Sequence, residues 1–181
     1  SMTSILGTQS IQHPNGTASA TVSADGTFSS PGHVIQTLNA TTSTGITTTS
    51  GTLADVGLSV TITPKFATSK IIVFYTVSFY ILGGGADSNF SVLLVRNING
   101  GSFSTLDAGT DNNGTSSAYI SSSSGNMEMA GRYTDVFTDS PNTTNACIYK
   151  LQGSAAGAGG QVYLGSLGGS NNHMVVQEIA Q

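Results

Sequence analysis

The chain has 181 residues, enough for one domain with a sizeable core and a small appendage. Only 8% of the residues are charged, against roughly a quarter in ordinary soluble domains, and the formal net charge is −4. The basic residues are few and scattered, which gives no support to nucleic-acid binding. Glycine-rich turn signals between dense Val, Ile, Phe and Tyr segments argue against disorder and predict an all-β protein.

The first segment, residues 1–30, predicts a thin β structure. Small apolar residues alternate with Ser and Thr over Ala18–Val22, and the tight-turn dipeptides Asn15-Gly16 and Asp25-Gly26 flank this strand. Such a strand buries too little to fold by itself. We therefore expect it to pair with its own copies, as a shaft, attachment or trimerisation segment in front of a head domain at 31–181.

The strongest strand signal lies at Lys70–Leu82. Its odd positions are apolar without interruption, which predicts a central strand facing a core. Many of its even positions are also apolar, and one sandwich core can cover only one face. The second face therefore predicts a contact between subunits, with these candidate interface residues: Ile72, Phe74, Tyr80 and Leu82.

Short strands separated by turn residues are expected along the rest of the head. They lie at His33–Ala40, Gly45–Thr49, Gly57–Thr63, Asn89–Ile98, Ser102–Leu106, Ser117–Ile120, Met127–Thr138, Ala146–Gln152, Gln161–Leu167 and His173–Ile179. This spacing, without helical periodicity, is typical of a sandwich or jelly roll. We therefore expect a jelly-roll β-sandwich head behind a short N-terminal β segment.

Four stretches resemble known proteins: GTQSIQHPNGTASATVSADGTF, HVIQTLNATTSTGITTTSGTLADVGLSVTITPKFATSKIIVFYTVSF, YKLQGS near Lys150, and the closing HMVVQEIAQ. The first resembles N-terminal segments of bacteriophage tail-fibre-like and virion structural proteins. The others resemble a C-terminal head domain of such proteins, especially from marine phages. Many such heads resemble the trimeric jelly rolls of the tumour-necrosis-factor and complement-C1q type. The resemblance implies this fold and a homotrimer, and it maps no binding residue.

The function that this resemblance implies is that of a tail-fibre or spike-tip protein on the surface of the phage particle. Its partners would be its own copies, other virion proteins and a glycan or protein of the host surface. Two alternatives stay open. The chain could be a purely structural decoration or adaptor protein of the virion, or a secreted C1q-like glycan-binding module.

Polar loops at one end of the head would supply the binding site. The segments Asp107–Gly114 and Ser121–Asn126 are dense in Asn, Asp and Ser, which can donate to and accept from sugar hydroxyls. A tyrosine between them could stack on a sugar ring. Three copies would add avidity. The candidate ligand-binding residues are Asp111, Asn112, Asn113 and Tyr119.

No catalytic, cofactor or metal motif is expected to operate. The histidines His13, His33 and His173 have no second ligand at metal spacing, although a trimer axis could gather three copies of one of them. Cys147, the only cysteine, excludes an internal disulfide and lies in an apolar run, so we expect a buried thiol. Glu128 and Asp135 are the acids considered for a glycosidase pair, without a motif that joins them. We expect no enzyme, no cofactor, no bound metal and no membrane insertion.

Overall fold

The structure is a computed structural model that describes residues 10–16, 18–84, 88–107, 119–120, 126–156, 160–166 and 171–181. These residues form fourteen strands and no helix, which confirms the predicted all-β class. The described residues therefore contain no helix that could cross a membrane. The strands are β1 (Ser10–Gln12), β2 (Ala18–Val22), β3 (Phe28–Ser29), β4 (Val34–Thr42), β5 (Ile46–Thr48), β6 (Ala54–Ile62), β7 (Lys70–Gly84), β8 (Ser88–Ile98), β9 (Ser104–Asp107), β10 (Tyr119–Ile120), β11 (Asn126–Asp139), β12 (Cys147–Ala156), β13 (Gln161–Leu164) and β14 (Asn172–Ile179).

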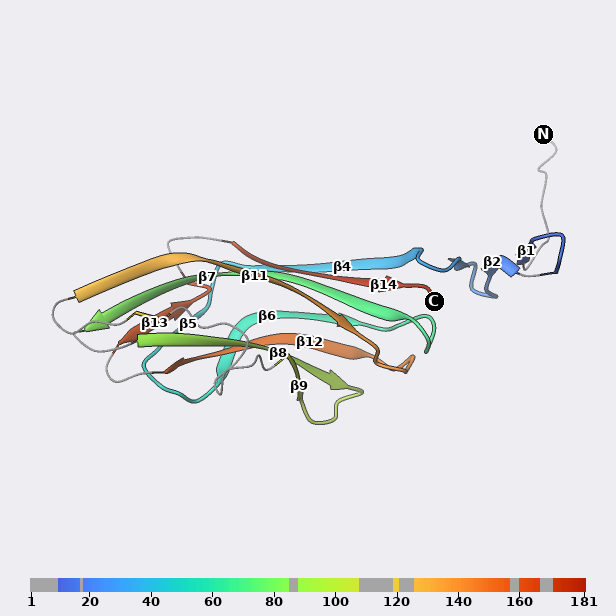
Figure 1. The fold of residues 1–181 in the computed structure, drawn as a ribbon. Helices are drawn as coiled ribbons and strands as arrows, with labels where there is room; N and C mark the ends of the chain where they lie inside the picture. The colour runs from blue at the N-terminus through green and yellow to red at the C-terminus, as the bar shows by residue number, and fades with distance from the viewer. Residues whose placement is uncertain are drawn as a thin grey trace, which may run out of the picture.

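The strands form three antiparallel sheets. Sheet I is small and has the order β1-β2-β3. Sheet II has the order β4-β14-β7-β13-β5, with β11 paired to the other side of β7. Sheet III has the order β10-β8-β12-β6, with β9 also paired to β8. Sheets II and III stack as two layers of an elongated head, and sheet I extends from one end of it (Figure 1).

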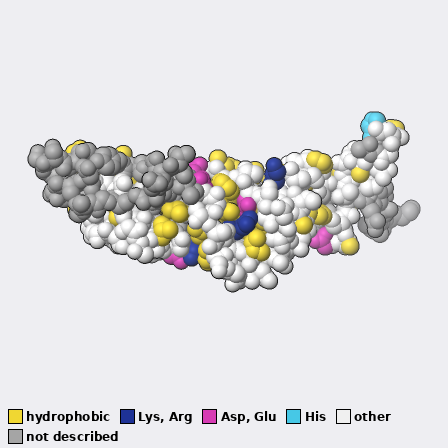
Figure 2. Space-filling model, turned by 60° about the horizontal axis from the view of Figure 1, so that its bottom comes forward, with side chains coloured by type: hydrophobic (Ala, Val, Ile, Leu, Met, Phe, Trp, Pro, Cys, Tyr) yellow, Lys and Arg dark blue, Asp and Glu magenta, His cyan; other side chains and the backbone are white. Residues whose placement is uncertain are grey.

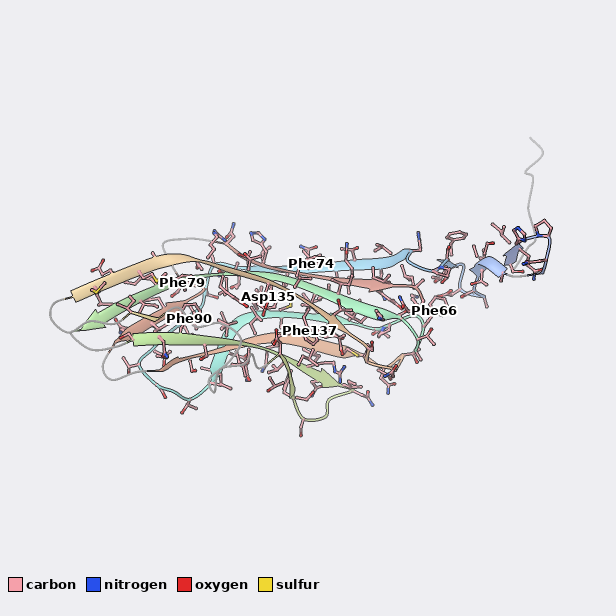
Figure 3. The ribbon with its side chains drawn as sticks, in the orientation of Figure 1. Phe66, Phe74, Phe79, Phe90, Asp135 and Phe137 are labelled. Atoms are coloured by element: carbon pink, nitrogen blue, oxygen red, sulfur yellow. The ribbon has the colours of Figure 1, made fainter. Side chains whose placement is uncertain are left out.

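The core lies between sheets II and III. Alternate residues of the long strands point into it, because the two faces of a strand alternate with a period of two. On β7 the odd-numbered side chains are buried, and on β6 the even-numbered ones are, as predicted. Phe79 and Phe90 meet across the layers, with ring centroids 4.7 Å apart (Figure 3). Both sheets contribute to a single hydrophobic cluster, which makes the head one folded unit.

Strand β7 organises sheet II. One of its edges pairs with β11 along its whole length, from Ile71 opposite Asp139 to Gly84 opposite Asn126. Its other edge pairs first with β14 and then with β13, so two shorter strands share one side of it. The structure therefore confirms the predicted central position of this strand. The pairing explains why its length exceeds that of a typical strand.

Sheet I has apolar residues on one face. Register places Ile11 beside Ala20 and Phe28 beside Val22, while Ser and Thr side chains occupy the other face. Two links tie this sheet to the head: an ion pair between Lys65 and Asp25 (3.1 Å) and an edge-on ring contact between Phe28 and His33. The sequence predicted only β2 of these strands, because β1 and β3 are two or three residues long.

Candidate functional site

The candidate interface residues of β7 all point away from the core. Ile72, Tyr80 and Leu82 are half-buried, and the Phe74 side chain is 42% exposed. Figure 3 shows Phe74 on the side of sheet II that faces away from sheet III. We call this side the outer face of sheet II. The sequence thus predicted the direction of these four side chains, and their role in assembly stays a prediction.

Neighbouring strands add apolar side chains that sequence reasoning missed. Val136 on β11 and Val175 on β14 lie opposite Phe74 on its two sides, and Val136 is 53% exposed. Together with Ile72 these residues form what we call the apolar patch. Period-two alternation in β11 and β14 could have indicated their direction, but only strand pairing brings them to Phe74. A shallow hollow in this patch is lined by Phe74, Tyr75, Thr76, Thr134, His173 and Val175.

The half of the outer face that lies away from sheet I is more polar than the apolar patch. The rings of Tyr80 and Tyr163 lie edge to face with centroids 5.5 Å apart, and the Tyr163 hydroxyl donates to Gln161 Oε1 at 2.6 Å. A hydrogen bond to the Glu128 carboxylate is the main reason why the pKa of Tyr80 is raised above its ordinary value. These polar groups form the edge of the apolar patch on the side away from sheet I.

The charged residues of β7 and β11 on the outer face lie four or more positions along the ladder from Phe74. Lys70 begins β7 at the end near sheet I, Arg132 lies opposite Ser78 near the middle of β7, and Glu128 lies opposite Leu82 towards the other end. The Arg132 guanidinium donates to the backbone oxygen of Asn171 at 2.9 Å. The register of β7 with its neighbours places no charged residue opposite Phe74. The uncharged surroundings of Phe74 suit contact with another apolar surface.

The predicted loop site lies almost wholly outside the described residues. Asp111, Asn112 and Asn113 belong to that part of the chain. Tyr119 is described as the first residue of β10, where it pairs with Asn89 of β8. Asn126, predicted as the end of a loop, is the first residue of β11. The predicted loop site therefore stays a prediction.

Catalytic and metal arrangements do not assemble among the described residues. Glu128 and Asp135 are seven positions apart on β11 and so point to opposite faces of sheet II, which separates the acids considered for glycoside cleavage. The histidines lie on three different elements: His13 in the β1–β2 turn, His33 against Phe28 and His173 on β14. No group of three or more metal-ligating side chains occurs in this part of the chain.

A buried polar cluster ties the two sheets together. Asp139, at the end of β11, accepts hydrogen bonds from Arg96 Nη1 of β8 at 2.6 Å and from the Tyr149 hydroxyl of β12 at 2.7 Å. Burial, and next the bond to Asp139, raise the pKa of Tyr149 far above its ordinary value. Cys147 is fully buried beside this cluster, as predicted, and burial raises the pKa of its thiol. Because this cluster faces the interior, we assign it a role in stabilising the fold.

Among the described residues, no strand of sheet III carries an exposed large hydrophobic side chain comparable to Phe74 or Val136. Lys150 lies 4.1 Å from the Phe103 ring centroid and also pairs with Asp55 at 2.8 Å. Figure 2, which looks at the head from this side, shows hydrophobic side chains dispersed among uncharged polar ones, with few charges. The outer face of sheet II is therefore the best candidate for a functional surface.

A scan against models of known protein families finds no match for this chain, and a search of curated proteins finds no similar sequence.

Proposed function

We propose that the chain forms a homotrimeric jelly-roll head of a bacteriophage appendage, which contacts the host surface. The fold part of this proposal is supported by the strand order. Sheet II contains the run β4-β14-β7-β11 and sheet III the run β6-β12-β8 with β9 and β10. Successive long strands β6, β7 and β8, and later β11 and β12, alternate between the two sheets. This interleaving is consistent with a β-sandwich, and it supports the proposal of a jelly roll because the two Greek keys of a jelly roll also alternate between sheets.

The apolar patch is the observation that carries the proposal of assembly. Phe74 and Val136 lie side by side and are about half exposed, and no charged residue lies opposite Phe74 on either neighbouring strand. Such a patch on a soluble protein marks an interaction surface. A second and third copy of the chain, placed around a three-fold axis in front of this face, would cover it.

The position of the two termini supports a role as an appendage. Sheet I and the C-terminus lie at the same end of the head (Figure 1). Backbone hydrogen bonds from Gly32 N to Ala180 O and from Ala180 N to His33 O join them there. In this proposal the partner binds at the opposite end of the head, where β7 ends and β11 begins. An appendage protein needs this division between an attached end and a free end.

The measurement that tests the assembly is light scattering on the purified full chain, at low micromolar concentration. We expect three times the chain mass of 18.3 kDa. Val136→Lys should prevent assembly, since it places a charge in the apolar patch, whereas Ser59→Lys on the outward side of sheet III should not. A wild-type mass of one chain refutes the trimer.

The host-surface role needs a separate test. Labelled protein should be located on virions, and purified trimer should compete with phage adsorption. Alanine at Asp111, Asn112, Asn113 and Tyr119 in a protein that stays trimeric should weaken cell binding. Virion location without competition would instead favour the structural decoration or adaptor role. Glycan binding without virion location would favour the secreted module.

A further inference from the structure

The second edge of β11 is a surface that neither the core nor the apolar patch uses. β11 pairs with β7 through fourteen consecutive residues without a bulge, and no strand of the described residues pairs with its other edge. Residues 127–130 are exposed on both faces, including Met127 at 48% and Met129 at 42%. A long free edge of this kind is a template for another strand.

Several of the devices that protect an edge strand are missing from β11, although it carries the charged residues Glu128, Arg132, Asp135 and Asp139. Soluble proteins block such edges with lysine, proline, a bulge or a very short strand. β11 has no lysine and no proline, its register with β7 is continuous, and it is one of the two longest strands of the described residues. An edge without these features is compatible with a partner strand.

The charges of β11 select the partner. Glu128 and Arg132 are both exposed on the outer face of sheet II, with Ala130 midway between them. If a second β11 runs antiparallel with Ala130 opposite Ala130, each Glu128 lies opposite an Arg132 of the other copy. Opposite charges at directly facing positions stabilise a strand pair, and like charges there destabilise it.

Other nearby registers lack this match. With Glu128 or Arg132 on the two-fold axis, two like charges would face each other. With Gly131 on the axis, neither charge would have an opposite partner. In this register the numbers of two facing residues are both even or both odd, so their side chains lie on the same face of the extended sheet. A two-fold axis perpendicular to the sheet requires this arrangement.

We propose that β11 pairs antiparallel with β11 of a second copy, about a two-fold axis at Ala130, over residues 126–134. The pair would extend sheet II across both copies and cover Met127 and Met129 with Tyr133 and Gly131 of the other strand. Within the described residues one of the five Arg132 donors is used, by the backbone oxygen of Asn171, so donors remain for the new ion pair. The contact uses the sheet edge, so it is separate from the three-fold contact proposed for the outer face.

A cysteine on the axis tests the geometry directly. Facing Cα atoms of an antiparallel pair are about 4.5–5.5 Å apart, within disulfide range. Ala130→Cys should therefore give a disulfide-linked dimer under mild oxidation of the full chain, and the native Cys147 should not interfere because it is buried. Thr138→Cys is the matched control, exposed on the same strand and face but outside the pair.

Charge exchange shows whether Glu128 and Arg132 set the register. Glu128→Arg alone or Arg132→Glu alone should abolish the Ala130→Cys crosslink. The double exchange should restore it, because it recreates both ion pairs. A crosslink that forms equally well with Thr138→Cys, or that survives the single exchanges, overturns the proposal.

Mass measurement separates this contact from the trimer. If both contacts form, species larger than three chains should appear at high concentration, and Val136→Lys should reduce them to two chains. If only the β11 contact forms, the mass should be two chains with or without Val136→Lys. A mass of three chains, with no larger species and no Ala130→Cys dimer, would leave the trimer intact and refute the β11 pair.

Discussion

The side-chain oxygen of Asn172 accepts a hydrogen bond from the backbone nitrogen of Ser78 at 2.8 Å, at the point where β7 changes its partner from β14 to β13. The same oxygen also accepts from the Ser78 hydroxyl at 3.2 Å. Asn172 Nδ2 donates to Thr42 O at 3.0 Å and to Gly165 O at 2.7 Å. One fully buried amide thus replaces the backbone partners that a continuous neighbouring strand would supply.

Replacing Asn172 with alanine should destabilise the head by about 3 kcal/mol, because it leaves buried backbone groups of Ser78, Thr42 and Gly165 without partners. Urea denaturation followed by circular dichroism measures this change. Asn145→Ala, at an exposed position, is the control and should stay within about 0.5 kcal/mol of the parent protein. An equally small effect at Asn172 would mean that water or a rearranged strand satisfies these groups.

Gly131→Ala should cost about 1–3 kcal/mol, because the new methyl would overpack the core side of β11. A Cβ atom at Gly131 would lie 2.8 Å from Cζ of Phe79, whose ring covers this position. At Gly51 the nearest atom would be 3.6 Å away, so Gly51→Ala serves as the control. The test compares the unfolding midpoints of Gly131→Ala and Gly51→Ala. Equal midpoints would show that the Phe79 ring moves aside freely.

Alkaline pH should unfold the head. Burial, as the main cause, raises the pKa of Tyr75 and of Tyr149 well above the ordinary value of 10. A raised folded pKa means that the stabilisation is present below pH 10 and is lost as the pH rises above it, where the unfolded chain releases these protons. Absorbance at 295 nm should therefore show these two tyrosines ionising only together with loss of the β signal in circular dichroism. Ionisation of all six tyrosines near pH 10 in a folded protein would contradict this.

Strong acid should loosen the turn between β2 and β3 and weaken its ion pair with Lys65 of the head. The backbone N–H of Thr27 is the main reason, followed by its side chain and by Lys65, why the pKa of Asp25 is lowered from 3.8 to about 2. Because the folded pKa lies below the unfolded value, the stabilisation is present above pH 4 and is lost as the pH falls through 2.

Carboxyl carbon shifts in an NMR titration would locate this midpoint. Lys65→Met should raise the pKa of Asp25 only in part, since the bonds to Thr27 are the larger cause. A wild-type midpoint near 4 would show that the turn does not hold the carboxylate.

The strands of the head could be predicted because their apolar residues follow a period of two between turn residues. The strand expected at Lys70–Leu82 is Lys70–Gly84, and the one expected at Met127–Thr138 is Asn126–Asp139. Asn99 and Gly100, which follow β8, both have positive φ, as a primed hairpin turn requires. The strand expected at Gln161–Leu167 stops at Leu164, because Gly165 has a positive φ.

The surface could be predicted only in part, because pairing between distant strands decides what meets on it. The direction of Phe74 followed from its position in β7, but its contact with Val136 and Val175 depends on which strands lie beside β7. The role of Asn172 had no signal at all, since an asparagine beside a glycine-rich segment reads as a turn residue. Short strands such as β1 and β3 had too few residues to show a period.

The long axis of the head also decides how the protein would carry a load. The strands run along this axis, and the link to sheet I enters through β4, which pairs with β14 from Val34 opposite Ile179 to Thr42 opposite Asn172. Ladder hydrogen bonds lie across the strands, so a pull applied through residue 33 against the far end would strain the whole β4–β14 ladder at once. This shear arrangement resists tension far better than a ladder opened one bond at a time, and it suits a part that is held at one end while the other end is pulled.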